Sequence, residues 1–192
     1  RLFGNTASCQ ANVEVLPSAA CDKPSEYCTF TQGFYGNEGG IQFGQTTLEI
    51  IQDALSDGNG NNQPITLGSG SRTLQIDLEA AQCVIDLLPG GGPPKKLPKE
   101  NNILGAACNT GSIPIKNGRF HNILLAQTLT LALNTRYDEN LSGLALSDAC
   151  AFIPNSIYAA LGGNATIGDL LAHANDVLGG GNTQELSDIP EA

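Results

Sequence analysis

The residues best placed for acid–base chemistry are one histidine and the two aspartates around it. His173 follows Asp169 by four residues and precedes Asp176 by three, so on a helix the three side chains share a flank. A hydrolase would also need a nucleophile and a group that orients the base. No Ser or Cys lies in a nucleophile motif, and spacing alone cannot identify a glycosidase carboxylate pair. We therefore interpret the three residues as a solvated polar face, and His121 as a surface or capping residue.

A second group of polar residues matches part of a calcium-binding loop. Asp57, Asn59 and Asn61 match the first three ligand positions of the D-x-[DN]-x-[DN] pattern. The sixth position is Asn62, where glycine is required, and the twelfth is Gly68 instead of glutamate. We predict a flexible loop here, with calcium binding as the alternative, and no other cofactor.

Six cysteines indicate disulfide bonds instead of a metal site. Their number is even, none shows the C-x-x-C spacing of zinc or redox sites, and the chain has two histidines. Disulfides favour an oxidising, extracellular location. The sequence leaves the connectivity open, and closeness along the chain favours three pairs: Cys9–Cys21, Cys28–Cys83 and Cys108–Cys150.

The charge balance excludes several classes of partner. With 9 Lys and Arg against 19 Asp and Glu, the net charge is −10 at pH 7. Such a chain is unsuited to nucleic acid, whose phosphates require Lys and Arg, and to anionic membrane surfaces. No apolar run approaches the roughly 20 residues of a membrane-spanning helix, so we expect no membrane insertion. We expect Arg1 to be the mature N-terminus of a processed, secreted chain.

Residues 27–44, the aromatic segment, are expected to organise the core. The segment holds five of the ten aromatic residues in a chain with 6 Phe, 4 Tyr and no Trp: Tyr27, Phe30, Phe34, Tyr35 and Phe43. Aromatic rings bury a large apolar area, and the glycines between them allow tight turns. We predict that the segment anchors the core. The alternative is a surface on which a ligand stacks.

Capping and turn signals predict the elements that hold these residues. The predicted helices begin at four capping residues and one proline: Thr46, Asp77, Asn122, Thr166 and Pro154. Two β-hairpins are predicted, with turns at residues 68–71 and at Asn117-Gly118. The expected fold is therefore α+β: a disulfide-stapled mixed domain with about five helices, at least two hairpins and glycine-rich turns.

The chain divides into three predicted parts. Residues 1–26 form a disulfide-stapled N-terminal arm, residues 27–181 a single mixed α+β domain, and residues 182–192 an acidic tail. Residues 90–98, in which three glycines precede three prolines, interrupt helix and strand alike. They are the one candidate for a subdomain boundary.

Four segments occur in an order that resembles a domain of known proteins. They are TFTQGFYGN at 29–37, LLPGGG at 87–92, LLAQTLTL at 124–131 and TIGDLL at 166–171. Together they resemble a domain of secreted, often very large, cell-surface proteins of Bacteroidota-like bacteria, over about residues 27–181. The resemblance implies an extracellular location and a surface or matrix role. It carries over no catalytic residue.

These observations favour a non-enzymatic extracellular structural subunit that self-associates into a cell-surface filament or matrix. One alternative is a carbohydrate- or surface-binding adhesion module that uses the aromatic segment. A secreted hydrolase is the third reading. Asn140 and Asn164 stand in N-x-[ST] sequons, so a glycan is allowed where the host modifies such sites.

The predicted assembly contacts pair a basic cluster with an acidic tail. Lys95, Lys96 and Lys99 supply three of the nine basic residues. The tail contributes three acids: Glu185, Asp188 and Glu191. Complementary patches at different places on one molecule allow a heterologous contact, which propagates into open polymers unless it closes into a ring.

Overall fold

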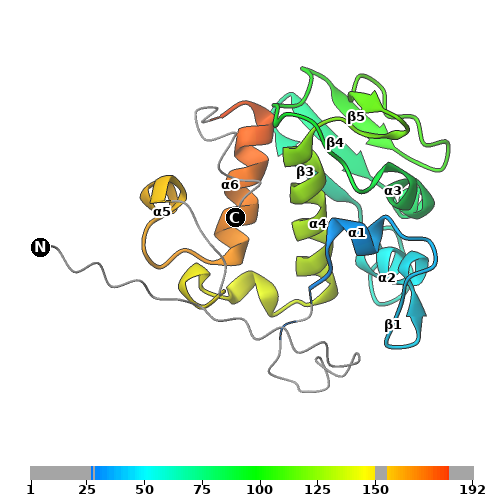
Figure 1. Cartoon of the computed structure of the whole chain (residues 1–192), viewed down its shortest axis with the longest axis horizontal. Helices are drawn as coiled ribbons and strands as arrows, with labels where there is room; N and C mark the ends of the chain where they lie inside the picture. The colour runs from blue at the N-terminus through cyan, green and yellow to red at the C-terminus, as the bar shows by residue number, and fades with distance from the viewer. Residues whose placement is uncertain (1–26, 28, 150–154, 182–192) are drawn as a thin grey trace, which may run out of the picture.

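The computed structural model describes residues 27, 29–149 and 155–181 of the chain. The predicted N-terminal arm and acidic tail lie outside these residues. Within the described residues the fold is α+β, with six α-helices, small sheets and a disulfide bond (Figure 1). The predicted fold class is confirmed.

Most helices are short, and α4 and α6 are the longest. The helices are α1 (Gln32–Tyr35), α2 (Thr47–Ala54), α3 (Ala81–Leu87), α4 (Ile123–Tyr137), α5 (Asn155–Leu161) and α6 (Ile167–Gly179). The strands are β1 (Ile41–Gln42), β2 (Gln45–Thr46), β3 (Ile65–Ser69), β4 (Arg72–Ile76), β5 (Asn101–Leu104), β6 (Ile115–Lys116) and β7 (Arg119–Phe120). Short 3₁₀ turns lie at Leu78–Ala80, Leu141–Gly143 and Leu146–Asp148. No helix in the described part of the chain combines the length and apolar character needed to cross a membrane.

A three-stranded sheet joins the two sides of residues 90–98. β3 pairs antiparallel with β4, and β4 pairs in parallel with β5. A parallel pair needs a crossover connection, which here contains α3 and residues 90–98 (Figure 1). Leu97 in this segment is buried, and its N–H donates to the carbonyl of Leu178 at 2.8 Å. The candidate boundary segment is therefore packed onto the same core as the strands on either side of it.

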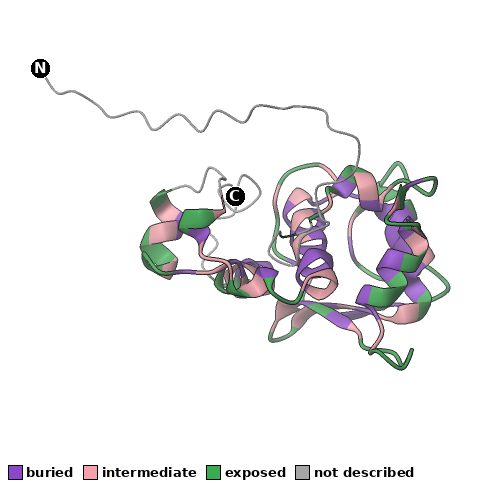
Figure 2. Ribbon diagram, turned by 90° about the horizontal axis from the view of Figure 1, so that it is seen from below, coloured by how far each residue is buried: buried purple, intermediate pink, exposed green. Residues whose placement is uncertain are grey.

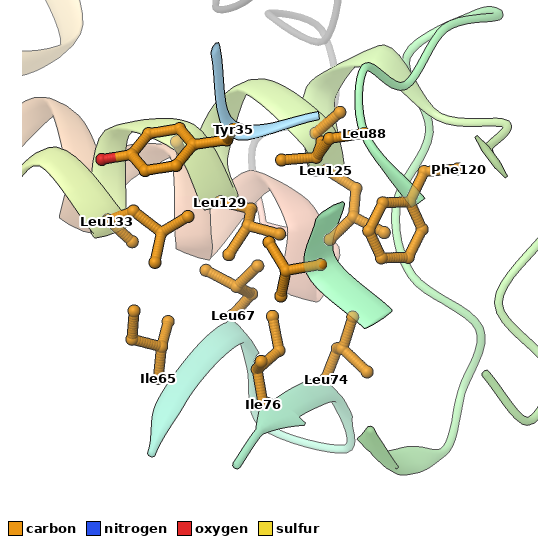
Figure 3. Close-up of a cluster of buried hydrophobic side chains, with 14 of the residues drawn as sticks. Tyr35, Ile65, Leu67, Leu74, Ile76, Leu88, Phe120, Leu125, Leu129 and Leu133 are labelled. Carbon is orange, nitrogen blue, oxygen red and sulfur yellow. The ribbon is translucent and has the colours of Figure 1, made fainter. Parts of the chain in front are cut away.

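The core lies between this sheet and the helices α4 and α6. Alternate residues of β3 and β4 point inward and are buried: Ile65, Leu67, Leu74 and Ile76. Figure 3 shows them facing leucines of α4: Leu125, Leu129 and Leu133. Figure 2 shows buried residues on the inner sides of the elements and exposed ones in the outer turns. Each fully buried side chain of this size stabilises the fold by about 1.5–3 kcal/mol.

Three of the predicted capping residues begin their helices as expected. Thr46 forms a capping box with Glu49, and Thr166 forms one with Asp169. The Asn122 side chain accepts a hydrogen bond at the start of α4. Pro154 lies outside the described residues, directly before α5. Local sequence was sufficient here because a cap bonds groups that lie within one helical turn.

Asp77 precedes its helical segment, but its side chain makes no capping bond, so this detail of the prediction is wrong. The N–H of Leu78 donates instead to Asn62 Oδ1 at 2.9 Å. The Asp77 carboxylate accepts from Gln75 Nε2 at 2.8 Å. Asn62 stands 16 residues before Leu78 in the chain, so a local motif could not reveal this cap.

Both predicted hairpins are present, and a third begins in the aromatic segment. The β6–β7 turn places Asn117 and Gly118 at φ 54° and 77°, the left-handed region that Asn-Gly favours. The third hairpin, β1–β2, has Phe43 and Gly44 in the same positions at φ 51° and 81°. A phenylalanine at positive φ is a backbone outlier.

The disulfide joins Cys83 to Cys108, so the predicted pairs Cys28–Cys83 and Cys108–Cys150 are wrong. Cys83 lies on α3 and Cys108 in the loop after β5, and their Cα atoms are 5.3 Å apart. The parallel pairing of β4 with β5 brings the end of β5 to α3, although 25 residues separate the two cysteines. Cysteines paired by their closeness along the chain cannot reveal a contact that a crossover connection creates. The remaining cysteines lie outside the described residues: Cys9, Cys21, Cys28 and Cys150.

Candidate functional site

Tyr35 anchors the aromatic segment in the core, as predicted. Its side chain is fully buried, and its hydroxyl donates to Asn134 Oδ1 on α4 at 2.9 Å. Burial raises the pKa of the Tyr35 hydroxyl far above its usual value, and the neighbouring Tyr137 adds to the effect. Asn134 Oδ1 also accepts from Phe30 N at 2.8 Å, and its Nδ2 donates to Phe30 O at 3.0 Å. One asparagine therefore fixes the segment to α4.

Phe30 and Phe34 are partly buried and complete an aromatic cluster. Their rings stack with centroids 4.3 Å apart, and Phe30 meets Tyr137 edge-on at 5.0 Å. Tyr27 and Phe43 do not join the cluster, because each is 43% exposed. The prediction that they are core aromatics is wrong. Phe43 sits at the tip of the β1–β2 hairpin, where few neighbours can cover its ring.

A cavity of about 440 Å³ lies beside this cluster. It is lined by residues 30–33, by one face of α4 and by α6: Gln127, Thr128, Thr130, Leu131, Asn134, Ile167, Leu170 and Ala174. None of these residues is charged. The hydroxyls of Thr128 and Thr130 donate to the carbonyls of Leu124 and Ala126 in their own helix, at 2.8 and 2.9 Å. The cavity is suited to an uncharged group because its lining carries no charge, and its volume is typical of a binding pocket.

The β1–β2 hairpin presents apolar side chains to solvent. Ile41 is 68% exposed and Phe43 is 43% exposed. None of the residues from Ile41 through Thr46 is charged. The base of the hairpin is fixed, because Thr47 N donates to Gly40 O at 3.0 Å and Thr47 Oγ1 donates to Asn37 O at 2.8 Å. The hairpin is thus an uncharged projection that is hydrogen-bonded at its base.

β5 is an edge strand of its sheet, and its outer face presents an apolar side chain. Ile103 is 60% exposed. Thr73 N donates to Glu100 O and Asp77 N donates to Leu104 O, so the even-numbered residues of this strand face β4. Along a parallel strand, successive residues direct their backbone N–H and C=O groups to opposite sides, so only alternate residues bond to a given neighbouring strand. The backbone groups of Ile103 therefore point away from β4, toward an edge where no strand of the described residues pairs.

The basic cluster lies directly before this edge. Lys95, Lys96 and Lys99 are exposed, as predicted. The backbone that carries them is held firmly: Asn122 Nδ2 donates to Lys95 O at 2.7 Å, and Asn122 Oδ1 accepts from Lys95 N at 3.1 Å. Arg72 Nη1 donates to the carbonyl of Leu97. The predicted acidic counterparts lie outside the described residues: Glu185, Asp188 and Glu191.

The partial calcium motif forms a turn that is closed by its own hydrogen bonds. Asp57 Oδ1 accepts from the N–H groups of Asn59 and Asn61, and Asp57 Oδ2 accepts from Asn61 Nδ2, each at 2.9 Å. The Asn61 side chain thus directs its N–H₂ group, not its oxygen, at Asp57. These bonds, those from Asn61 first, lower the pKa of Asp57. In the described part of the chain, no group of three or more His, Cys, Asp or Glu residues is arranged to hold a metal ion.

The histidine flank lies on α6, as predicted, with one aspartate engaged in the helix cap. Asp169 Oδ2 accepts from Thr166 N and from Thr166 Oγ1, both at 2.9 Å, and these bonds lower the pKa of Asp169. Asp169, His173 and Asp176 all line one shallow depression of the surface. His121 is partly buried after β7, where its N–H donates to Pro114 O at 2.8 Å. The arrangement indicates helix capping for Asp169.

The sequence reasoning missed Ile103, Gln127 and Asn134. Gln127 and Asn134 lie in an apolar helical run, and which face of such a helix borders a cavity depends on tertiary packing. Ile103 stands in a short apolar run of the sequence. Its position on an unpaired strand follows only from the order of the strands in the sheet. A signal for the β1–β2 hairpin was available, since Phe43-Gly44 separates two short strand-like pairs.

Scans of protein-family models, of curated proteins and of solved structures find no match to this chain.

Proposed function

We propose that this protein is a non-enzymatic extracellular structural subunit that self-associates into a cell-surface filament or matrix. The observation that carries the proposal is the open edge of β5, with Ile103 60% exposed beside it. A strand edge with unpaired backbone groups is a template for a strand of another chain. An exposed isoleucine next to it favours association further, because pairing removes apolar area from water.

The opposite edge of the same sheet, formed by β3, is protected by α6. The N–H of Gly68 in β3 donates to Asn175 Oδ1 of α6 at 2.9 Å. A Cβ at Gly179 would clash with Ser69, so α6 lies close against β3. Soluble proteins commonly cover exposed edges in this way. The fold covers one edge and leaves the other open, as a subunit that pairs through β5 requires.

The basic cluster suits an assembly contact between acidic subunits. Copies with a net charge of −10 repel each other, and the three lysines place positive charge in the segment that leads into β5, on a backbone that Asn122 holds at Lys95. An exposed ion pair contributes only about 0.2–1 kcal/mol, so the lysines would set the register and rate of association more than its strength. The acidic tail remains the proposed counterpart.

The described polar residues support a structural role more than catalysis. Asp57 and Asp169, from the two candidate chemical groups, close a turn and cap a helix. The Cys83–Cys108 disulfide supports an oxidising, extracellular location. The binding-module alternative is favoured by one observation: Phe30 of the aromatic segment lines the uncharged cavity. Glycan-array binding by the monomer would support that alternative.

The proposal is tested by sedimentation velocity and negative-stain imaging over a concentration series at low salt. We expect wild type to form extended assemblies and Ile103→Lys to shift the onset of assembly to at least tenfold higher concentration. The matched control is Thr66→Lys, which places the same charge at an exposed position of β3, whose edge is protected. Wild type that stays monomeric at the highest concentration contradicts the proposal.

A further inference from the structure

The β1–β2 hairpin carries features that give the single molecule no evident benefit. Phe43 adopts φ 51°, a conformation that disfavours a bulky side chain. Its ring is 43% exposed, and its neighbour Ile41 is 68% exposed. Backbone strain at an exposed position points to a function, because folding alone does not retain it. The position suits a contact that forms outside the molecule.

Electrostatics restrict where two copies can meet. Each copy has a net charge of −10, so close approach is least opposed where both surfaces are uncharged. The hairpin is one such surface, with no charge from Ile41 through Thr46. The cavity of about 440 Å³ beside α4 is another, since none of its lining residues is charged. The two surfaces match in apolar character as well, because an exposed ring and an apolar cavity both lose unfavourable contact with water on association.

The hairpin of one copy cannot fill the cavity of the same copy. In Figure 1 the hairpin lies beyond α2, and α4 and α1 stand between it and α6. The bonds of Thr47 to Gly40 and Asn37 hold the hairpin base in place. A β1–β2 hairpin that fills this cavity therefore comes from a second molecule.

We propose that the β1–β2 hairpin of one copy inserts Phe43 and Ile41 into the cavity between residues 30–33, α4 and α6 of a second copy. This inference rests on the proposed self-association and names one of its contacts. The hairpin tip with Ile41 and Phe43 (the knob) and the cavity (the socket) lie at different places on the molecule. The contact is therefore heterologous and can propagate into a filament. Phe43 is the expected anchor, since buried aromatic residues dominate the energetics of interfaces.

Two single variants test the contact from both sides. Phe43→Asn removes the ring and places Asn-Gly in a turn that favours it, so the hairpin stays folded. Gln127→Glu puts a charge on the cavity wall with almost no change of shape. We expect each variant to weaken association at least tenfold in sedimentation experiments. Gln52→Glu, the same change at an exposed position of α2, is the matched control and should assemble like wild type.

Mixing the variants gives the sharper result. The Phe43→Asn copy keeps its socket and the Gln127→Glu copy keeps its knob, so an equimolar mixture should form a 1:1 dimer at a concentration where each alone is monomeric. If wild type assembles and both variants assemble equally well, the knob-and-socket contact is wrong while the proposed function stands. If wild type stays monomeric at every concentration, the proposed function fails as well. A cavity that binds neutral oligosaccharide in that monomer supports the binding-module alternative.

Discussion

At the residue scale, Asn134 determines where the aromatic segment crosses the core. Its side-chain amide accepts from Phe30 N and Tyr35 Oη and donates to Phe30 O. A buried amide must find partners, or its desolvation costs about 1–3 kcal/mol. Asn134 therefore selects one position of the segment on α4, and the same position brings Phe30 to the cavity wall.

Phe43 is the residue whose substitution is expected to stabilise the monomer. A left-handed conformation costs a bulky L-residue about 1–2 kcal/mol, and asparagine tolerates it. Phe43→Asn should therefore raise the stability of the subunit by roughly 1 kcal/mol, or about 2–4 °C in Tm, in a thermal melt at a concentration where it is monomeric. Phe43→Ala separates the two effects, because it removes the ring and keeps the strain. A lower Tm for Phe43→Asn would mean that the ring packs on the subunit itself.

At the element scale, the two capping boxes define where α2 and α6 begin. Each threonine accepts from the third backbone N–H of its helix, while Glu49 or Asp169 accepts from the threonine N–H. These bonds satisfy donors that an α-helix leaves unpaired at its start. The beginning of α6 lies at the site, because Ile167, the first residue of the helix, lines the cavity.

The α6 cap should make stability depend on pH in a defined way. Hydrogen bonds from Thr166 lower the pKa of Asp169 in the folded protein, so the ionised carboxylate stabilises the fold above its unfolded pKa of about 3.9. That stabilisation is lost as the pH falls through the lowered folded pKa. Asp169→Asn should therefore be less stable than wild type at pH 7 in urea denaturation, with the difference vanishing in strong acid. A stability difference that is the same at pH 7 and in strong acid would contradict this role of the Asp169 carboxylate.

At the scale of the whole molecule, the crossover from β4 to β5 connects all parts of the fold. It contains α3, the disulfide cysteine Cys83 and the lysine cluster, and it ends at the open edge. Leu97 and Lys95 attach it to α6 and to the start of α4 through backbone bonds. The proposed assembly surface is consequently a product of the chain topology, since it joins β5 to residues fixed by distant elements.

The Cys83–Cys108 bond should stabilise this crossover measurably. A disulfide that closes a loop of this length typically contributes about 3 kcal/mol, so the double variant Cys83→Ala and Cys108→Ala should lose a comparable amount in urea denaturation. Mass spectrometry of an unreduced digest should link the Cys83 peptide to the Cys108 peptide. A link from Cys83 to Cys28 would restore the pairing expected from the sequence.

The sequence by itself determined features whose causes lie within a few residues. The capping boxes at Thr46 and Thr166 and the Asn117-Gly118 turn follow from local hydrogen bonding and backbone preference. The α+β class follows from the same local signals, because helical and hairpin patterns alternate along the chain. The even cysteine count indicated disulfides without indicating their pairs.

Only the tertiary structure decided which groups meet across the chain. Cys83 pairs with Cys108 because a parallel crossover brings α3 to the end of β5, and Asn62 caps Leu78 from 16 residues away. The exposure of Ile103 and Phe43 depends on which edge and which tip the packing leaves uncovered. Hydrophobicity and propensity describe each residue alone, whereas an edge, a cavity or a disulfide is a relation between segments. Such relations are set by how the sheet and helices exclude water together, and no local pattern carries them.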